Sequence, residues 1–246
     1  MAISLIDAFW SFLPLILITG ATIIVYIRGR KVNSRMMETT TEEIKVTMAP
    51  YGVDQLLEEK RTSSGLVLDG KVKKADSSLR SFRAVLSLDD RQLLISYLFM
   101  KLTRPNDYVL FETTFKSRPK VSLQVIPRQE ESLIRKYAEY LTKLDDVSLA
   151  EAVKKREVSS KILKFDETFL VKSTNRRLAL AIVGNAQFVR TMLKMEKAAY
   201  WMAVDRSENV FKAMFKLNDS LDMTAFAELF IDMTERISSL KDTRRH

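Results

Sequence analysis

The run AFWSFLPLILITGATIIVYI (residues 8–27) decides how this chain is built, because it carries no charged side chain and leads directly into RGRKVNSR (28–35). A helix needs about 20 consecutive apolar residues to cross the hydrocarbon core of a bilayer. No Lys or Arg precedes position 28 and no small-residue cleavage site follows the run, so the pattern of a secretory signal peptide is missing. The sequence therefore predicts an uncleaved membrane anchor over residues 1–27. The alternative is a buried core helix of a soluble protein.

The charges around the run predict its orientation. Four cations follow it: Arg28, Arg30, Lys31 and Arg35. By the positive-inside rule they place the C-terminal side in the cytoplasm, with Asp7 and the N-terminus outside or in a lumen. Trp10 and Tyr26 lie near the two ends, as interfacial aromatic residues do. We expect a single-pass protein of the cell membrane in a prokaryote, or of the endoplasmic reticulum in a eukaryote, whose four cations bind lipid headgroups.

Several small or polar residues interrupt the apolar run: Ser11, Pro14, Thr19, Gly20 and Thr22. Such residues are common where membrane helices pack together, so they are candidate contacts with a second helix. The alternative is that the hydroxyl groups bond to their own backbone and face lipid.

The composition of the chain points to anionic partners. There are 40 Lys and Arg against 31 Asp and Glu in 246 residues, a net charge of +9, and every Lys and Arg follows the apolar run. This favours lipid headgroups, acidic proteins or RNA. Cysteine is absent, which excludes disulfides and thiolate metal sites and fits a reducing compartment.

The pattern after the run predicts an α+β protein. Residues 28–64 read as a basic, Thr-rich linker, with a short helix at 53–60 after the turn at 50–52. A first unit, 65–146, follows: strands at 66–73 and 79–88, a helix at 91–102 capped by Asp89 or Asp90, strands at 108–115 and 121–126, and a helix at 129–144. A charged connector occupies 147–160.

The same order of elements recurs in a second unit, 161–241. We expect a strand at 163–172, a helix that Ser173, Thr174 or Asn175 caps and that runs to 195, strands at 199–205 and 209–217, and a last helix capped by Asp219 or Ser220. A basic tail, 242–246, ends the chain. The prediction is one transmembrane helix followed by two tandem β-α-β-β-α units, with an α+β domain without duplication as the alternative.

No motif of enzymatic chemistry is apparent. The single histidine is His246 at the terminus, and there is no G-x-G-x-x-G, P-loop or G-x-S-x-G pattern. The acidic pairs at 89–90 and 145–146 read as helix caps or loop residues. We therefore predict a protein that is not an enzyme and that has no cofactor or metal. An anchored hydrolase, which would need a polar cleft, is the minority alternative.

A second basic group lies in FKSRPK (115–120). Lys116, Arg118 and Lys120, with Arg244 and Arg245 of the tail, are candidate contacts for a polyanion such as ribosomal RNA. Aromatic residues are not interleaved with these cations, so no sequence-specific DNA binding is expected.

Residues 82–144, FRAVLSLDDRQLLISYLFMKLTRPNDYVLFETTFKSRPKVSLQVIPRQEESLIRKYAEYLTKL, resemble the cytosolic domain of the calumin family, coiled-coil-domain proteins of the endoplasmic reticulum membrane. The resemblance rests on the order of elements, on Gln92-Leu93-Leu94 and on Arg104-Pro105, with one membrane span before the domain. It implies a subunit of a membrane-protein insertion machine that works beside the Sec translocon and the ribosome with small multi-pass insertion factors.

The chain departs from that family in two places. The long acidic lumenal region before the span is missing, so calcium binding is not carried over, and KDTRRH stands where a Lys-rich coiled coil would follow. We expect a minimal, archaeal type of relative: a membrane-anchored, non-enzymatic accessory factor in membrane-protein insertion. The alternative is an anchored scaffold for an unrelated cytosolic partner.

Overall fold

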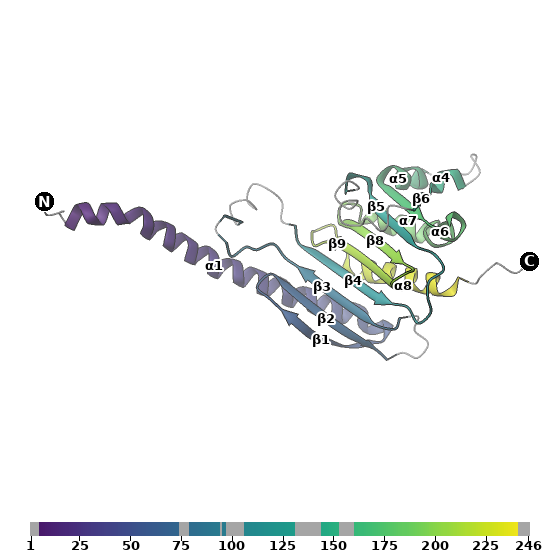
Figure 1. Ribbon diagram of the computed structural model, residues 1–246, viewed down its shortest axis with the longest axis horizontal. Coiled ribbons are helices and arrows are strands. Elements are labelled where there is room, and N and C mark those ends of the chain that lie inside the picture. The colour runs from purple at the N-terminus through teal and green to yellow at the C-terminus, as the bar shows by residue number, and fades with distance from the viewer. Residues whose placement is uncertain are drawn as a thin grey trace, which may run out of the picture.

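The computed structural model describes residues 5–73, 79–93, 95–96, 106–130, 144–152 and 160–240. Within these ranges the chain is an α+β protein, with one long N-terminal helix and one sheet of nine strands (Figure 1). The strand order is β1-β2-β3-β4-β9-β8-β5-β7-β6, and every neighbouring pair is antiparallel.

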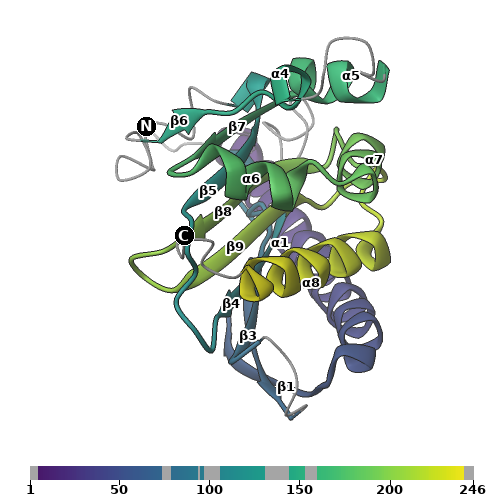
Figure 2. The same ribbon diagram turned by 90° about the vertical axis from the view of Figure 1, so that its right-hand side faces the viewer.

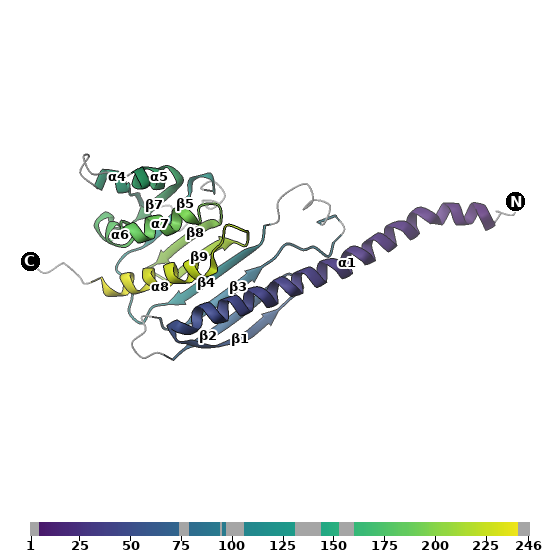
Figure 3. The same cartoon turned by 180° about the vertical axis from the view of Figure 1, so that it is seen from behind.

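Helix α1 (Leu5–Met48) continues without interruption from the apolar run onto the sheet (Figures 1 and 3). The linker predicted at 28–64 is therefore wrong over its first part. Buried positions recur every three or four residues along this part of the helix: Gly29, Asn33, Met37, Thr40, Ile44 and Met48. This stripe packs on the domain, and tertiary packing of one face stabilises a helix whose threonines alone would not favour it. The helix ends at the predicted turn, where η1 (Ala49–Tyr51) precedes Gly52 at φ 82°.

Strand β1 (Val53–Arg61) replaces the helix predicted at 53–60, so that prediction is also wrong. It pairs with β2 (Gly65–Val72) at the edge of the sheet. The two strands approach closely at Gly70, where a Cβ atom would lie 2.6 Å from Cγ1 of Val53. The glutamates and lysine of β1 favour a helix locally, but sheet pairing overrides that propensity, and charged residues are common on exposed edge strands.

Five further strands match the predicted ones within a few residues: β3 (Phe82–Ser87), β4 (Tyr108–Thr114), β5 (Leu123–Pro127), β8 (Ala199–Asp205) and β9 (Val210–Lys216). The helix η2 (Arg128–Glu130) follows β5. The predicted helices at 91–102 and 129–144 lie largely outside the described residues, as does the basic tail.

Strands from the two predicted units interleave in the sheet. Strand β4 from the first unit pairs with β9 from the second, and β5 lies between β7 and β8. Strands of both predicted units therefore hydrogen-bond to one another within a single sheet. The division into two tandem β-α-β-β-α units is not confirmed.

The segment after the connector differs most from its prediction. The first predicted unit ends in β6 (Asp145–Asp146), and the connector contains α4 (Leu149–Ala152). The strand predicted at 163–172 is wrong in its first half, where α5 (Ser160–Thr168) stands, and β7 (Phe169–Ser173) forms only the second half. Asn175 caps the next helix as expected, but Gly184 and Asn185 divide it into α6 (Arg176–Val183) and α7 (Ala186–Lys194).

The main core lies between the sheet and the helices on one of its faces. Helix α8 (Met223–Ser239) and the second half of α1 lie side by side on that face (Figures 2 and 3). Phe226 and Phe230 of α8 are fully buried, with ring centroids 4.4 Å and 5.6 Å from that of Phe111. These aromatic contacts join α8 to the middle of the sheet.

Helix α8 begins at Asp222, not at the predicted caps Asp219 or Ser220. The Asp222 carboxylate accepts a hydrogen bond from the backbone N–H of Ala225 (3.0 Å), and Lys194 Nζ lies 2.6 Å from it. The Ala225 hydrogen bond, followed by that from Lys194, lowers the pKa of Asp222. Because the folded state holds this carboxylate ionised, the stabilisation is present above the carboxyl's unfolded pKa and disappears as pH falls through its folded pKa.

We expect Asp222→Ala to lower the free energy of unfolding at pH 7 by about 0.5–2 kcal/mol, the usual cost of losing a cap. The difference from the parent protein should shrink as pH falls below about 4, because the carboxyl of the unfolded chain becomes protonated first and that of the folded chain follows at its lower pKa. Urea denaturation of the detergent-solubilised chain at pH 7 and pH 3 measures both values. Asp219→Ala, at an exposed residue that caps nothing, is the matched control. Equal losses for the two variants would contradict the assignment of the cap.

Candidate membrane-proximal site

Among the described residues, one helix is long and apolar enough to cross a membrane, judged by length and composition. It is α1, and its apolar window is only 6% buried. Leu17, for example, is 63% exposed. A core helix of a soluble domain would be covered, so the apolar run is not the core helix of this domain.

The candidate helix-contact residues of the run whose side chains are described, Pro14, Thr19, Gly20 and Thr22, lie away from the domain. Thr22 donates its hydroxyl to the backbone oxygen of Ile18 (2.8 Å), as in the alternative of self-bonding within the helix. A Cβ atom on Gly20 would meet nothing within 4 Å, and Pro14 and Thr19 are exposed. The side chain of Ser11 lies outside the described residues. Contact of these residues with a second membrane helix stays a prediction.

The four predicted headgroup ligands, Arg28, Arg30, Lys31 and Arg35, are all exposed on α1 just after the apolar run. Between them in the sequence, Gly29 and Asn33 are buried on the side of the helix that meets the domain. A Cβ atom on Gly29 would overlap the carbonyl oxygen of Arg91, so the helix backbone lies directly against the loop after β3. The helix therefore joins the domain within one turn of the apolar run and presents its cations outward.

A buried polar network fixes this junction. Asn33 is 0% exposed, and its amide nitrogen donates to the backbone oxygens of Ser63 (3.2 Å) and Asp89 (3.1 Å). Its amide oxygen accepts a hydrogen bond from Arg91 Nη1 (2.8 Å). Both polar atoms of the Asn33 side chain are thus paired. Their hydrogen bonds connect α1 to the β1–β2 turn and to the loop after β3.

Arg91 continues the network to the start of β4. It forms a two-pronged ion pair with Asp107, in which Nη1 lies 3.0 Å from Oδ1 and Nη2 bonds to Oδ2. Asp107 is 2% exposed and also accepts the backbone N–H of Asp89 (2.8 Å). Sequence reasoning placed Asp89 in a helix cap and did not identify Asn33, Arg91 or Asp107. The only local signal was the helical spacing of Gly29, Asn33 and Met37.

Beside this junction is a cavity of about 570 Å³, the juxtamembrane pocket. Its lining comes from α1, from the end of β1 with the β1–β2 turn, and from the loop after β3: Tyr26, Arg30, Ser34, Met37, Arg61, Thr62, Ser63 and Gln92. Arg61 Nη2 donates to Ser34 Oγ (3.2 Å) and also lies 3.6 Å from a Glu38 oxygen. The pocket lining therefore combines two arginines, hydroxyl-bearing residues and Gln92 with the less polar side chains of Tyr26 and Met37.

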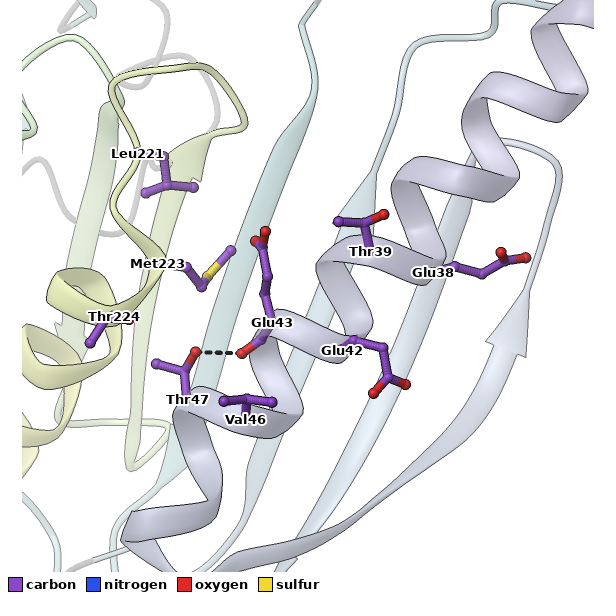
Figure 4. A pocket seen from close by; sticks show the side chains of 9 residues that line it. All are labelled: Glu38, Thr39, Glu42, Glu43, Val46, Thr47, Leu221, Met223 and Thr224. Carbon is purple, nitrogen blue, oxygen red and sulfur yellow. Dashed lines mark hydrogen bonds between the residues drawn. The ribbon is translucent and has the colours of Figure 1, made fainter.

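A second and larger hollow, of about 790 Å³, lies between α1 and the start of α8 (Figure 4). From α1 the lining includes Glu38, Glu42 and Glu43. From the start of α8 and the loop before it come Leu221, Met223 and Thr224. Figure 4 shows the Glu43 side chain directed into the space between the two helices, whereas Glu38 and Glu42 point away from it. The exposed side of α1 thus changes from basic near the apolar run to acidic farther along.

The opposite face of β1–β4 is turned away from α1 and α8, and no described element lies in front of it in Figure 1. Val67, Val85 and Leu110 stand in register across three strands of this face. In the next row Arg83 Nε bonds to Asp69 Oδ1 (2.7 Å), and this hydrogen bond lowers the pKa of the Asp69 carboxyl and raises that of Arg83. The face is a mixed polar and apolar surface.

The second predicted basic group lies far from the first. Lys116, Arg118 and Lys120 follow the end of β4 that is opposite to Asp107. Arg118 Nε donates to the backbone oxygen of Arg206 (2.8 Å) in the β8–β9 turn, so this side chain has a structural contact. Arg244 and Arg245 lie outside the described residues. Among the residues that the structure describes, cations of the two groups are not brought together.

No family model and no curated protein sequence matches this chain. Among solved structures, the chain is similar to the crystal structure of the mycobacterial trehalose monomycolate transport factor A, TtfA. The TM-score is 0.34 and the sequences are 11% identical, over 80% of this chain and 91% of that chain. A likeness of this degree says nothing about the function of the chain.

Proposed function

We propose that this chain is a membrane-anchored, non-enzymatic docking protein. Residues 8–27 cross the bilayer, and α1 holds the sheet domain at a set height and rotation against the membrane surface. The observation that carries the proposal is the continuity of α1 from the apolar run into the buried junction around Asn33. A flexible linker would let the domain search for partners, whereas this helix presents fixed faces to whatever lies beside it in the membrane.

The orientation follows from the charges on α1. Arg28, Arg30, Lys31 and Arg35 would keep the domain on the cytoplasmic side, with the N-terminus outside or in a lumen. Their exposure leaves them able to contact headgroups, where each cation contributes about 1 kcal/mol of attraction to an anionic surface.

The resemblance of residues 82–144 to calumin implies a more specific role. We propose an accessory factor in membrane-protein insertion and folding that works beside the Sec translocon and the ribosome. The domain offers two surfaces for such partners, the open face of β1–β4 and the hollow between α1 and α8. An unrelated cytosolic partner is the alternative, and the same experiment distinguishes the two.

The test is to purify the tagged full-length protein in mild detergent, with and without a crosslinker, and to identify its partners by mass spectrometry. We expect Sec subunits, small multi-pass insertion factors and ribosomal proteins. They should be lost when residues 1–27 are deleted. Recovery of one unrelated complex would favour the alternative, and recovery of nothing beyond an anchor-only control would refute both.

Helix insertions test whether the rigid connection matters. Two alanines inserted between Ile24 and Val25 would rotate the domain by about 200° relative to the start of the helix, whereas four would rotate it by only about 40°. We expect the two-residue insertion to abolish partner capture and the four-residue insertion to retain most of it. Equal capture by both variants would show that the orientation of the domain is irrelevant.

A further inference from the structure

The juxtamembrane pocket lies at the depth of lipid headgroups if α1 crosses a bilayer, and in this respect the inference rests on the proposed function. The interfacial layer on each side of a bilayer is about 5–8 Å thick. With a helical rise of about 1.5 Å per residue, Arg30 stands about 4–5 Å beyond Ile27, and Ser34 about 10 Å beyond it. Tyr26 lines the pocket from the end of the apolar run. The end of the pocket that Tyr26 and Arg30 line therefore lies within this layer, and Ser34 lies just beyond it.

The lining suits a phosphate group. It contains two guanidinium groups, from Arg30 and Arg61, and no acidic residue. Hydroxyl-bearing residues surround them: Ser34, Thr62 and Ser63. Guanidinium groups bind phosphate oxygens in pairs of parallel hydrogen bonds, and hydroxyl groups can donate to the remaining oxygens. A volume of about 570 Å³ is ample for a glycerophosphate headgroup.

The two arginines differ in how they are held. No hydrogen bond or ion pair of the Arg30 side chain is found among the described residues. Arg61 bonds to Ser34 Oγ and lies 3.6 Å from carboxylates of Glu38 and Glu58, and all three charged side chains are at least 38% exposed. Exposed pairs at this distance contribute little stability, so a phosphate can displace them.

We propose that the juxtamembrane pocket binds the phosphate of one anionic phospholipid headgroup, with Arg30 and Arg61 as its ligands from two different elements. The bound lipid then connects α1 to the β1–β2 turn at the membrane surface. This site is distinct from the diffuse attraction of Arg28, Lys31 and Arg35, because those three residues do not line the pocket.

The test is native mass spectrometry of the delipidated full-length protein, titrated in detergent with phosphatidylglycerol or phosphatidylcholine. We expect one phosphatidylglycerol to bind with clear preference. The pair Arg30→Gln with Arg61→Gln should weaken that binding about tenfold or more, since two charge-assisted contacts are lost. The matched control, Arg177→Gln with Arg190→Gln, removes the same charge from exposed positions on α6 and α7 that do not line the pocket, and should leave the affinity within about twofold.

Each other outcome has a defined meaning. Equal weakening by the two double variants, or no weakening by the pocket variant, would overturn the site. Inorganic phosphate and glycerol 3-phosphate are added as competitors, and displacement of the lipid by inorganic phosphate at matching concentration would assign the pocket to a free anion. Fractionation of cells expressing each variant separates this inference from the anchor. A chain found outside the membrane would refute the proposed function, whereas a membrane-bound chain without lipid selectivity would refute only the pocket.

Discussion

Phe230→Ala is expected to lower the free energy of unfolding by about 3–5 kcal/mol, the usual cost of truncating a buried phenylalanine. Phe230 is 0% exposed, and its ring stacks on that of Phe211 with centroids 4.8 Å apart. It also meets the rings of Phe82 at 6.1 Å and Phe111 at 5.6 Å, both edge-on. One side chain of α8 thus connects three strands, β3, β4 and β9, and its loss leaves a cavity among aromatic rings that cannot close around it.

Urea denaturation of the detergent-solubilised protein, followed by far-ultraviolet circular dichroism, measures the change. Leu57→Ala is the control, because Leu57 is 54% exposed on the edge strand β1 and its truncation should cost within about 0.5 kcal/mol. A cost for Phe230→Ala close to that of the control would contradict the described core. Phe230→Leu, which fills much of the cavity, should recover part of the loss.

The strands at the centre of the sheet and the last helix could be predicted from sequence, because one face of each is covered. Burial alternates along β4, and the buried residues of α8 recur every three or four positions. The spacing of Phe226 and Phe230 therefore showed the covered side of the helix directly. The strand partners could not be predicted, since alternation shows which side of a strand is buried and carries no information about its neighbours.

Three secondary-structure predictions are wrong for the same reason. In each segment the local sequence permits two structures, and tertiary contacts determine which one forms. The stripe of α1 includes Asn33 and Thr40, and these buried polar residues hide its helical period. The strand predicted at 163–172 is formed only in its second half, because Ile162 and Phe165 also stand at helical spacing and α5 extends to Thr168 before β7 begins at Phe169. In β1, residues that favour a helix form a strand because they pair with β2.

Only the exposed cations of the candidate site could be predicted from the sequence, and the buried network could not. The cations at its exposed surface are adjacent along the chain and follow an apolar run, so composition alone located them. The network beneath them joins Asn33 to Arg91, 58 residues later, and Arg91 to Asp107. Nothing in a single sequence associates an asparagine in one helix with an arginine in a distant loop, and only the packing of Gly29 against that loop brings them together.

Arg91→Ala is expected to lower the free energy of unfolding by about 3–5 kcal/mol, because it leaves the Asp107 carboxylate buried without its cation. Only the backbone N–H of Asp89 would still donate to that carboxylate among the described contacts. Arg83→Ala is the matched control. Arg83 also pairs with an aspartate, Asp69, but both side chains are 43% exposed, and the loss of such a pair costs up to about 1 kcal/mol. Adding Asp107→Asn to Arg91→Ala should restore part of the stability, since it removes the buried charge.

The same substitution should loosen α1, because Arg91 connects Asn33 to Asp107 at the start of β4. The chain contains no cysteine, so spin labels can be placed uniquely by Val32→Cys on α1 and Lys60→Cys on β1, both at exposed positions. Pulsed electron resonance should give one narrow distance distribution for the parent protein and for Arg83→Ala. It should give a broader one for Arg91→Ala under conditions where the sheet stays folded. An unchanged distribution would mean that the buried stripe, with the bonds of Asn33 to Ser63 and Asp89, holds the helix without Arg91, and the rigid presentation of the domain would then not depend on the ion pair.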